Sequence, residues 1–338
     1  MGTILVGYIL GALCGASADA AVGWQRFTSS QVAMGTKVVI VLYAPDAATA
    51  NRAFAAAFAQ IAALDRMLSD YDSTSELMRL CGQSPTASPV PVSEELCEVL
   101  TFAQGLSRRT DGAFDVTVGP LTRLWRRARR RQEMPDPAQL AEAQKAVGYR
   151  YLVVNPSART VELLRPEMRI DLGAIGQGYA ADKALNVLRE QGISSALVNV
   201  SGDVVTSDPP PGEEHWTVLI APLGTETESG QPVHLRNAAV ATSGDVWQFV
   251  EINGQRYSHV LDPRTGLGLT ARCGVSVIAP NGMTADAFST AVSVLGVERG
   301  LALIQESPGT AALIARLEAG NVVTHQTPNF AGYLPSDP

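Results

Sequence analysis

The chain has 338 residues, of which 46% are hydrophobic, and a formal net charge of −7. A chain of this length and composition can bury a large core, so it is predicted to be globular rather than disordered. The negative net charge argues against general nucleic-acid binding, because that function requires an extended cationic surface to neutralise phosphates.

The N-terminal segment, residues 1–22, is typical of an export signal. Its apolar stretch runs from Ile4 to Ala16, and Ala16-Ser17-Ala18 suits a cleavage site, although no Lys or Arg precedes the stretch. The stretch is short for a membrane span, so an uncleaved anchor is the alternative. We expect a periplasmic protein, or one associated through its N-terminus with the outer face of the cytoplasmic membrane.

A strand and two helices are predicted in the first third of the chain. Gln31–Tyr43 is predicted to be a strand, Asp46 to cap a long Ala-rich helix, and Glu94–Arg108 to form a second helix. The apolar positions of the Ala-rich helix recur at helical spacing at Phe54, Phe58, Ile61, Leu64 and Leu68. Residues 123–131 hold six arginines, which could meet anionic lipid, an acidic partner or a nucleotide phosphate. Because two prolines follow at once, we interpret this run as a solvated connector.

The second half of the chain contains several short strands between helices. A hairpin is predicted over Tyr151–Asn155 and Thr160–Leu164, and a helix over Gly176–Gln191. Strand-like runs follow at Ala196–Val200, Trp216–Ala221, Val246–Ile252, Tyr257–Leu261 and Gly274–Ala279. A further helix and a last pair of short strands complete the order. Because strands and helices are grouped without regular alternation, the sequence favours an α+β fold.

The segment Asp286-Ala287-Phe288-Ser289-Thr290 places a carboxylate and a hydroxyl one turn apart near the start of that last helix. A hard cation such as Mg²⁺ takes oxygen ligands and is commonly completed by substrate phosphates, so this sparse pair suits phosphate chemistry. The alternative is structural: Asp286 caps the helix, and Thr290 bonds back to the carbonyl four residues earlier.

Two other segments carry candidate chemistry. Asp171–Asp182 passes from a strand end through glycines into a helix, where backbone amides and the helix N-terminus favour phosphate. It matches neither the P-loop nor the dinucleotide fingerprint, and such turns often serve packing only. Tyr257–Gly266 ends a strand in a polar turn with His259, which could be a general base, a phosphate ligand or a satisfied turn histidine.

Five segments occur in one order along the chain, and their combination is jointly specific. They are Met34-Gly35-Thr36, Asp111-Gly112-Ala113-Phe114-Asp115-Val116-Thr117, the Asp171 segment, the His259 segment and Thr284-Ala285-Asp286-Ala287-Phe288-Ser289-Thr290-Ala291. Together they resemble the ApbE family of FAD:protein FMN transferases. The resemblance covers residues 33–323.

The resemblance implies an α+β fold of two closely packed subdomains with FAD between them, here a domain at 30–325 followed by a tail at 326–338. It implies that Mg²⁺ helps to move FMN from FAD onto a Thr or Ser hydroxyl of a flavin-accepting redox protein, with release of AMP. The metal ligands would be the side chains of Asp286 and Thr290 and the backbone carbonyl of Ala174.

The same resemblance assigns cofactor contacts to residues spread over the chain. They are Met34 and Tyr71 beside the flavin, Ala113, Phe114, Asp115 and Asp171 at polar parts of FAD, Val260 through its main chain, and Gln177 and Asp203 near the cofactor. Related sequences commonly carry a Lys at the position of Gln177. A neutral donor in place of a charged one weakens a phosphate contact by about 1 kcal/mol.

We expect the acceptor hydroxyl to attack the FMN-side phosphorus of FAD, with His259 positioning or deprotonating it, a role that Asp286 or Asp262 could also take. One alternative is a FAD pyrophosphatase, in which water replaces the hydroxyl and FMN and AMP are released. Another is an exported flavin-binding protein without catalytic activity. A structural or partner-binding role of the arginine run would need no flavin.

Overall fold

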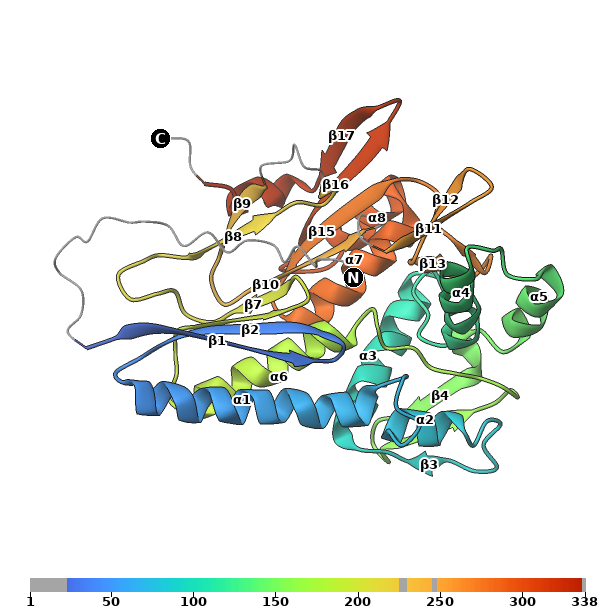
Figure 1. Ribbon diagram of the computed structural model, residues 1–338, viewed down its shortest axis with the longest axis horizontal. Helices are drawn as coiled ribbons and strands as arrows, with labels where there is room; N and C mark the ends of the chain where they lie inside the picture. Colours follow the sequence, from blue (N-terminus) through green and yellow to red (C-terminus); the bar gives the residue numbers. More distant parts are fainter. Residues whose placement is uncertain (1–22, 225–229, 245–247, 336–338) are drawn as a thin grey trace.

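The computed structural model describes residues 23–224, 230–244 and 248–335, so the predicted export signal lies outside the described residues. An eight-stranded sheet forms its centre, in the order β1-β2-β6-β7-β10-β15-β16-β17, and each neighbouring pair is antiparallel (Figure 1). Its strands are β1 (Gln25–Ala33), β2 (Thr36–Ala44), β6 (Ala196–Val200), β7 (Asp203–Thr206), β10 (Ala239–Gly244), β15 (Cys273–Ala279), β16 (Ala311–Glu318) and β17 (Asn321–Gln326).

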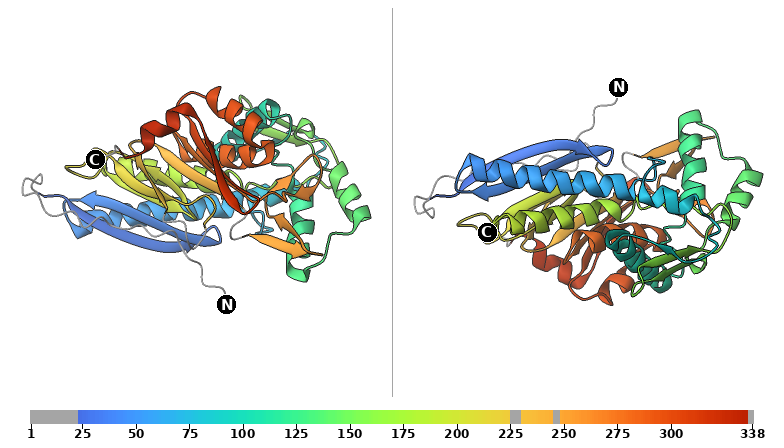
Figure 2. Two further views of the ribbon diagram at one scale, coloured as in Figure 1. Left: turned by 90° about the horizontal axis from the view of Figure 1, so that it is seen from above. Right: turned by 90° about the horizontal axis from the view of Figure 1, so that it is seen from below.

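Helices cover one face of this sheet, and α1 and α6 lie side by side on it (Figure 2). They are α1 (Ala47–Leu68), α6 (Gly176–Glu190), α7 (Gly282–Leu295) and α8 (Val297–Gln305). The Asp46 carboxylate caps α1 by accepting a hydrogen bond from the Thr49 N–H at 2.7 Å, and the apolar positions predicted for this helix are all buried. Helices grouped on one face of an antiparallel sheet confirm the α+β class.

The opposite face of the sheet is covered by the hairpin of β8 (Trp216–Ile220) and β9 (Gln231–Leu235) and by the 3-10 helix η2 (Pro328–Tyr333). Phe330 of η2 is fully buried against the sheet. The segment assigned to a C-terminal tail therefore begins with residues that close the core. None of the described helices combines the length and the apolarity of a membrane span.

A second group of elements is attached at one end of the sheet, at the right of Figure 1. Its helices are α2 (Glu76–Cys81), α3 (Glu94–Arg109), α4 (Gly119–Arg131), α5 (Pro137–Lys145) and the 3-10 turn η1 (Tyr149–Tyr151). Its strands are β3 (Val90–Pro91), β4 (Leu152–Asn155), β5 (Thr160–Leu163), β11 (Phe249–Ile252), β12 (Gln255–Ser258), β13 (Leu261–Asp262) and β14 (Leu267–Gly268). The predicted α3 and the β4–β5 hairpin are confirmed.

The single strand predicted over Gln31–Tyr43 is wrong, because this segment is a hairpin. Ala33 pairs with Thr36, and the two residues between them, Met34 and Gly35, both have positive φ (53° and 69°). Two positive φ values are what a two-residue hairpin turn requires, and they are usually supplied by Asn-Gly or Asp-Gly. Met34 therefore lies at a hairpin tip rather than within a strand.

The interpretation of the arginine run as a connector is also wrong, because residues 119–131 form α4. Leu121, Trp125 and Ala128 are buried at helical spacing, and the Trp125 indole N–H donates to the Gly266 carbonyl at 2.8 Å. This apolar stripe holds a helix whose other positions are mostly charged.

The strand predicted over Tyr257–Leu261 is interrupted at His259. Its first part belongs to β12, which pairs with β11, and its last part to β13, which pairs with β14. The backbone bends at residues 259 and 260, between the two parts. His259 therefore lies at a corner rather than within a strand.

Candidate functional site

The first turns of α6 and α7 touch through a pair of glycines. A Cβ atom added to Gly178 would lie 2.1 Å from the Gly282 carbonyl oxygen, and one added to Gly282 would lie 2.5 Å from the Gly178 carbonyl oxygen. Neither position tolerates a side chain, because the neighbouring atoms are backbone. The glycines thus bring the two helix N-termini into direct contact.

Each helix N-terminus at this crossing is capped by a carboxylate from the other helix. The Asp286 Oδ2 atom of α7 accepts a hydrogen bond from the Gly178 N–H of α6 at 3.1 Å. The Asp182 carboxylate of α6 accepts from the N–H groups of Gly282 and Met283 at 2.7 and 2.8 Å. These reciprocal contacts set the helices in antiparallel register, and negative charge is favoured at both helix N-termini.

The predicted metal ligands are near this crossing in the chain. Ala174 lies in the turn that leads into α6, just before its N-cap Ile175, and Thr290 follows Asp286 by one turn of α7. Ala174 and Thr290 are both partly buried, whereas Asp286 is only 6% exposed.

The structural alternative for Asp286 and Thr290 is not what the structure shows. The cap of α7 is Asn281, whose side-chain oxygen accepts from the Thr284 N–H at 2.9 Å. The side-chain bond to the Asp286 carbonyl is made by Ser289, at 2.8 Å, instead of by Thr290. The backbone of α7 is therefore capped and back-bonded without these two side chains.

Burial governs the charge of this site. It raises the pKa of Asp286 to about 7, the Asp182 charge adds to the rise, and the N–H groups of Gly178 and Gln177 oppose it. Asp203, at the start of β7, is also buried, and its pKa is raised by burial and then by the Asp286 charge. A bound cation would relieve both effects.

The oxygen donors fit a hard cation. The described residues contain no group of three His, Cys, Asp or Glu that could hold a metal ion. The predicted ligands are instead one carboxylate, one hydroxyl and one backbone carbonyl, which are ligand types that Mg²⁺ takes while keeping waters or substrate phosphates.

Met34 and Asp171 meet the same end of α6 from other elements. The Met34 N–H donates to the Asp65 carboxylate at 2.9 Å, and the Met34 Cε atom lies 3.9 Å from the place that a Cβ atom on Gly176 would take. Asp171 shapes the glycine turn by accepting from the Gly173 N–H at 2.8 Å. The predicted flavin-bordering methionine thus reaches the predicted phosphate-binding turn.

Arg126 of α4 connects three residues of the site, and sequence reasoning missed it. Its guanidinium lies 3.1 Å from the Asp171 carboxylate, forms an ion pair with Asp70, and has its Cζ atom 4.3 Å from the ring centroid of Tyr71. Tyr71 itself is 78% exposed. Burial, followed by the Asp171 charge, raises the pKa of Asp70. The apolar stripe of α4 was the signal that could have placed this arginine.

The three residues of the segment Ala113–Asp115 are buried and contact the surrounding fold. Ala113 packs with Val260 and Val294 in one buried cluster, so the structure brings two predicted contacts together, while Phe114 is in the main core. The Asp115 carboxylate accepts from the N–H and hydroxyl of Thr117 at 2.8 and 2.7 Å, and from the Tyr149 N–H at 2.6 Å. Both oxygens of the Asp115 carboxylate therefore already accept hydrogen bonds from neighbouring residues of the chain.

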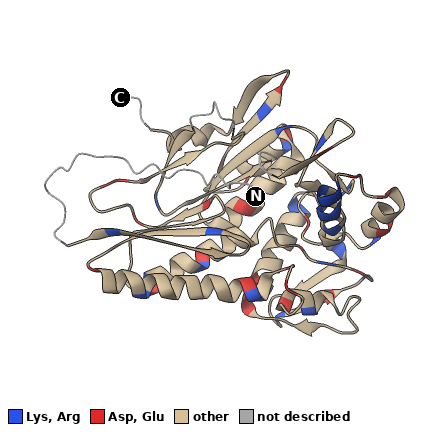
Figure 3. Ribbon diagram, viewed as in Figure 1, with Lys and Arg blue, Asp and Glu red and all other residues tan. Residues whose placement is uncertain are grey.

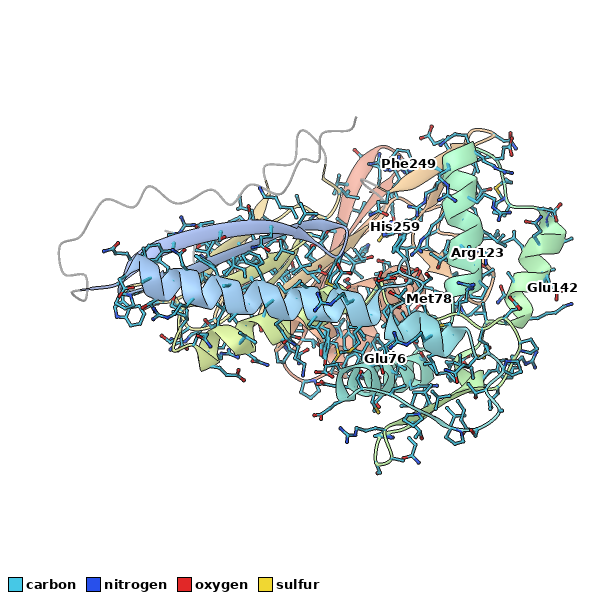
Figure 4. All side chains as sticks on the ribbon, turned by 60° about the horizontal axis from the view of Figure 1, so that its bottom comes forward. Glu76, Met78, Arg123, Glu142, Phe249 and His259 are labelled. Carbon is cyan, nitrogen blue, oxygen red and sulfur yellow. The ribbon has the colours of Figure 1, made fainter. Side chains whose placement is uncertain are left out.

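His259 lies on the β11 side of the site, next to α4. Its backbone N–H donates to the Gln248 carbonyl at 2.9 Å, and its Nδ1 atom lies 3.1 Å from the same oxygen. Arg129 of α4 donates to the Gln248 side chain at 3.2 Å. The side-chain view shows His259 and Phe249 labelled beside α4, which carries Arg123 (Figure 4). Asp286, by contrast, accepts its hydrogen bond from the Gly178 N–H of α6.

Comparisons with known proteins agree with the resemblance. The model of the ApbE family matches residues 34–314. A FAD:protein FMN transferase of Klebsiella pneumoniae strain 342 is 34% identical over 307 residues, 89% of this chain and 87% of the relative. One from Escherichia coli strain K12 is 35% identical over 285 residues, 82% and 80% of the two chains.

Solved structures show the same likeness. The flavinyl transferase ApbE of Pseudomonas stutzeri, in its apo form, superposes with a TM-score of 0.82 at 29% identity, over 93% of this chain and 98% of the other. The ApbE protein of Thermotoga maritima gives a TM-score of 0.82 at 27% identity, over 92% and 100%.

Proposed function

This chain belongs to the ApbE family, and we propose that it is an enzyme that transfers FMN from FAD to a target protein. The proposal is supported by relatives named FAD:protein FMN transferase that align with most of the chain, and by solved flavin transferases that share its α+β fold. We also propose a metal, an acceptor group and a location for this enzyme from the residues of the chain.

The observation that carries the proposal is the position of the Asp286 carboxylate. It is buried against the first N–H groups of α6, at the end of a glycine turn, and its own helix does not need it as a cap. Helix N-termini and exposed backbone amides are where proteins bind phosphate. We infer that Asp286, the Thr290 hydroxyl and the Ala174 carbonyl hold Mg²⁺ there. When bound, Mg²⁺ supplies neutralisation of the charge on the FAD diphosphate.

The residues of the chain then position the two reactants. Met34 and Tyr71 border the flavin, and Arg126 fixes Tyr71 through its ring and the glycine turn through Asp171. A Thr or Ser oxygen of the acceptor forms the new bond to the FMN phosphorus, the bond between the two phosphates breaks, and AMP leaves with its electron pair. His259 is the proposed group that takes the hydroxyl proton.

We propose three further properties of this enzyme. Gln177 supplies a neutral donor where relatives commonly carry Lys, so the diphosphate contact is weaker in this chain. The acceptor is a flavin-dependent redox protein, since covalently attached FMN serves redox chemistry. The segment at 1–22 directs the enzyme to the periplasm or the outer face of the cytoplasmic membrane.

The test is covalent labelling of an acceptor. The purified chain is incubated with FAD, MgCl₂ and a redox protein that has an exposed Thr, and FMN fluorescence is read on a denaturing gel while AMP is measured by chromatography. We expect labelled acceptor and an equal amount of AMP. Asp286→Ala should give neither, whereas Ser293→Ala, one turn beyond the site, should give both.

Each negative result has its own meaning. Free FMN and AMP without labelled acceptor would indicate FAD hydrolysis in place of transfer. FAD that stays bound and intact with every acceptor and every divalent metal would indicate a flavin-binding protein. Either result would overturn the proposed transferase activity.

A further inference from the structure

The outer face of α4 carries an unusual arrangement of charge. Arg123, Arg127, Arg130 and Arg131, called here the arginine stripe, lie on one side of the helix, opposite the buried Leu121, Trp125 and Ala128. Figure 3 shows α4 as the most concentrated basic element of the molecule. The stripe is local, because the whole chain has a net charge of −7.

The stripe is not explained by the fold. Members three and four residues apart repel one another, and such like-charge pairs destabilise a helix. The sequence of α4 contains no Asp or Glu that could offset the repulsion. Within residues 23–224, 230–244 and 248–335, no ion pair involves any of the four arginines. Of these four, only Arg130 and Arg131 lie in the last turn, where the helix C-terminus favours positive charge.

The stripe borders the candidate site through its neighbours on the same helix. Arg126, which precedes Arg127, reaches Asp171 at 3.1 Å. Arg129 reaches the Gln248 side chain at 3.2 Å, and the Gln248 carbonyl holds His259. One side of α4 therefore lines the site while the adjacent side presents the stripe to solvent. A macromolecule docked on the stripe would lie beside the site.

We propose that the arginine stripe is the docking surface for the acceptor protein, and that it recognises an acidic surface next to the acceptor hydroxyl. This inference rests on the proposed function, because only a protein acceptor must come so close to the bound FAD. The partly exposed Phe249 (37%), on β11 beside α4, adds an apolar contact at the edge of the stripe.

A protein partner is favoured over an anionic membrane by the way α4 is mounted. A helix that binds a membrane surface inserts its apolar face between the lipids. The apolar face of α4 is buried against β11, β13 and α5 instead. The surface that α4 exposes to a partner is therefore its charged side. Such a surface suits binding to an acidic protein surface, because complementary charges steer the two proteins toward each other.

The test uses two labelled peptides, identical around one Thr, in which the flanking residues are Glu in one and Gln in the other. Binding is measured by fluorescence anisotropy at low and high sodium chloride. We expect the wild-type chain to bind the Glu peptide about tenfold more tightly at low salt, the scale of three exposed ion pairs, and to lose this preference at high salt.

Two matched triple variants locate the effect. R123Q/R127Q/R131Q should lose the preference for the Glu peptide, whereas R52Q/R159Q/R299Q, which removes the same charge from exposed sites elsewhere, should keep it. FAD binding by both variants, followed by flavin fluorescence, should match the wild type and shows that each is folded. A wild-type chain that binds the two peptides equally overturns the proposal without reference to any variant.

The remaining outcomes separate this inference from the proposed function. Selective binding of the Glu peptide without FMN on either peptide would support the docking surface while contradicting the transfer activity. Equal transfer of FMN to both peptides at low salt would support the activity and overturn the docking role. Vesicles of phosphatidylglycerol that capture the wild type and not the stripe variant, with no peptide preference, would assign the stripe to a membrane and overturn the proposal.

Discussion

Replacing Gly178 by Ala is expected to separate α6 from α7 and to disable the site without touching any reactive group. The added Cβ atom would lie 2.1 Å from the Gly282 carbonyl oxygen, which is about 1.3 Å short of the 3.4 Å where ordinary van der Waals contact begins. It would also lie 2.8 Å from the Asp286 Cβ atom. Because the first obstacle is backbone, the helices must move apart.

The size of the effect follows from these distances. A separation of about 1.3 Å stretches the 3.1 Å hydrogen bond from the Gly178 N–H to Asp286 beyond 4 Å, where it no longer holds. Overpacking costs about 1–3 kcal/mol, and loss of a hydrogen bond to a buried carboxylate about 1–3 kcal/mol. A total of about 3 kcal/mol lowers the melting temperature of a chain of this length by about 4 °C.

The assay is a pair of measurements with a matched control. Melting temperature and FAD affinity in MgCl₂ are compared for Gly178→Ala, Gly105→Ala and the wild type. Gly105 also lies inside a helix, but a Cβ atom there meets nothing within 4 Å, so Gly105→Ala should raise stability by about 0.5–1 kcal/mol and leave FAD binding unchanged. A Gly178→Ala variant with wild-type melting and FAD affinity would refute the reasoning from helix contact.

Three further results are expected. Arg126→Gln leaves the carboxylates of Asp70 and Asp171 without their cation and should weaken FAD binding about tenfold in a flavin fluorescence titration. Arg126→Lys should recover part of this affinity. Unchanged affinity in both variants would argue against the positioning role of Arg126. Thr290→Val should raise the MgCl₂ concentration needed for FMN transfer about tenfold, whereas equal requirements in Thr290→Val and Ser293→Ala would remove the hydroxyl from the ligand set. In metal-free buffer, burial raises the pKa of Asp182 from 3.8 to about 6 and that of Asp286 to about 7. A raised carboxyl pKa stabilises the folded state fully below about pH 4. This stability is lost by about 1.4 kcal/mol per pH unit for each group, as the pH rises from 4 to about 6 for Asp182 and to about 7 for Asp286. Melting temperature should therefore fall between pH 4 and 7.5, and less steeply in Asp182→Asn; a flat profile would contradict the burial of both carboxylates.

Local patterns in the sequence were enough to predict the long elements. The Ala-rich helix after Asp46 is confirmed, because its cap and its apolar spacing act within one element and need no tertiary partner. The hairpin at Met34 and Gly35 was missed, because its two positive φ values occur without the Asn-Gly or Asp-Gly pair that usually marks such a turn. α4 was missed because charge dominates its composition and hides a stripe of three buried residues.

The candidate site also has residues that a local pattern predicts and contacts that no local pattern predicts. Asp286 and Thr290 could be selected from spacing on one helix, and the resemblance added Ala174. What supports them depends on contacts between distant segments, such as the reciprocal cap from Asp182, which lies about a hundred residues earlier. Arg126 joins Asp70 and Asp171 across still other elements. No pattern within one segment reports such contacts, because they exist only when the elements have packed.

The most direct test of the metal site is a crystal structure of the chain with FAD and Mn²⁺, which replaces Mg²⁺ and can be located by its anomalous scattering. We predict one ion at about 2.0–2.2 Å from the Asp286 carboxylate, the Thr290 hydroxyl and the Ala174 carbonyl, in contact with the FAD diphosphate. An ion bound elsewhere, or a diphosphate remote from the first turn of α6, would contradict the account.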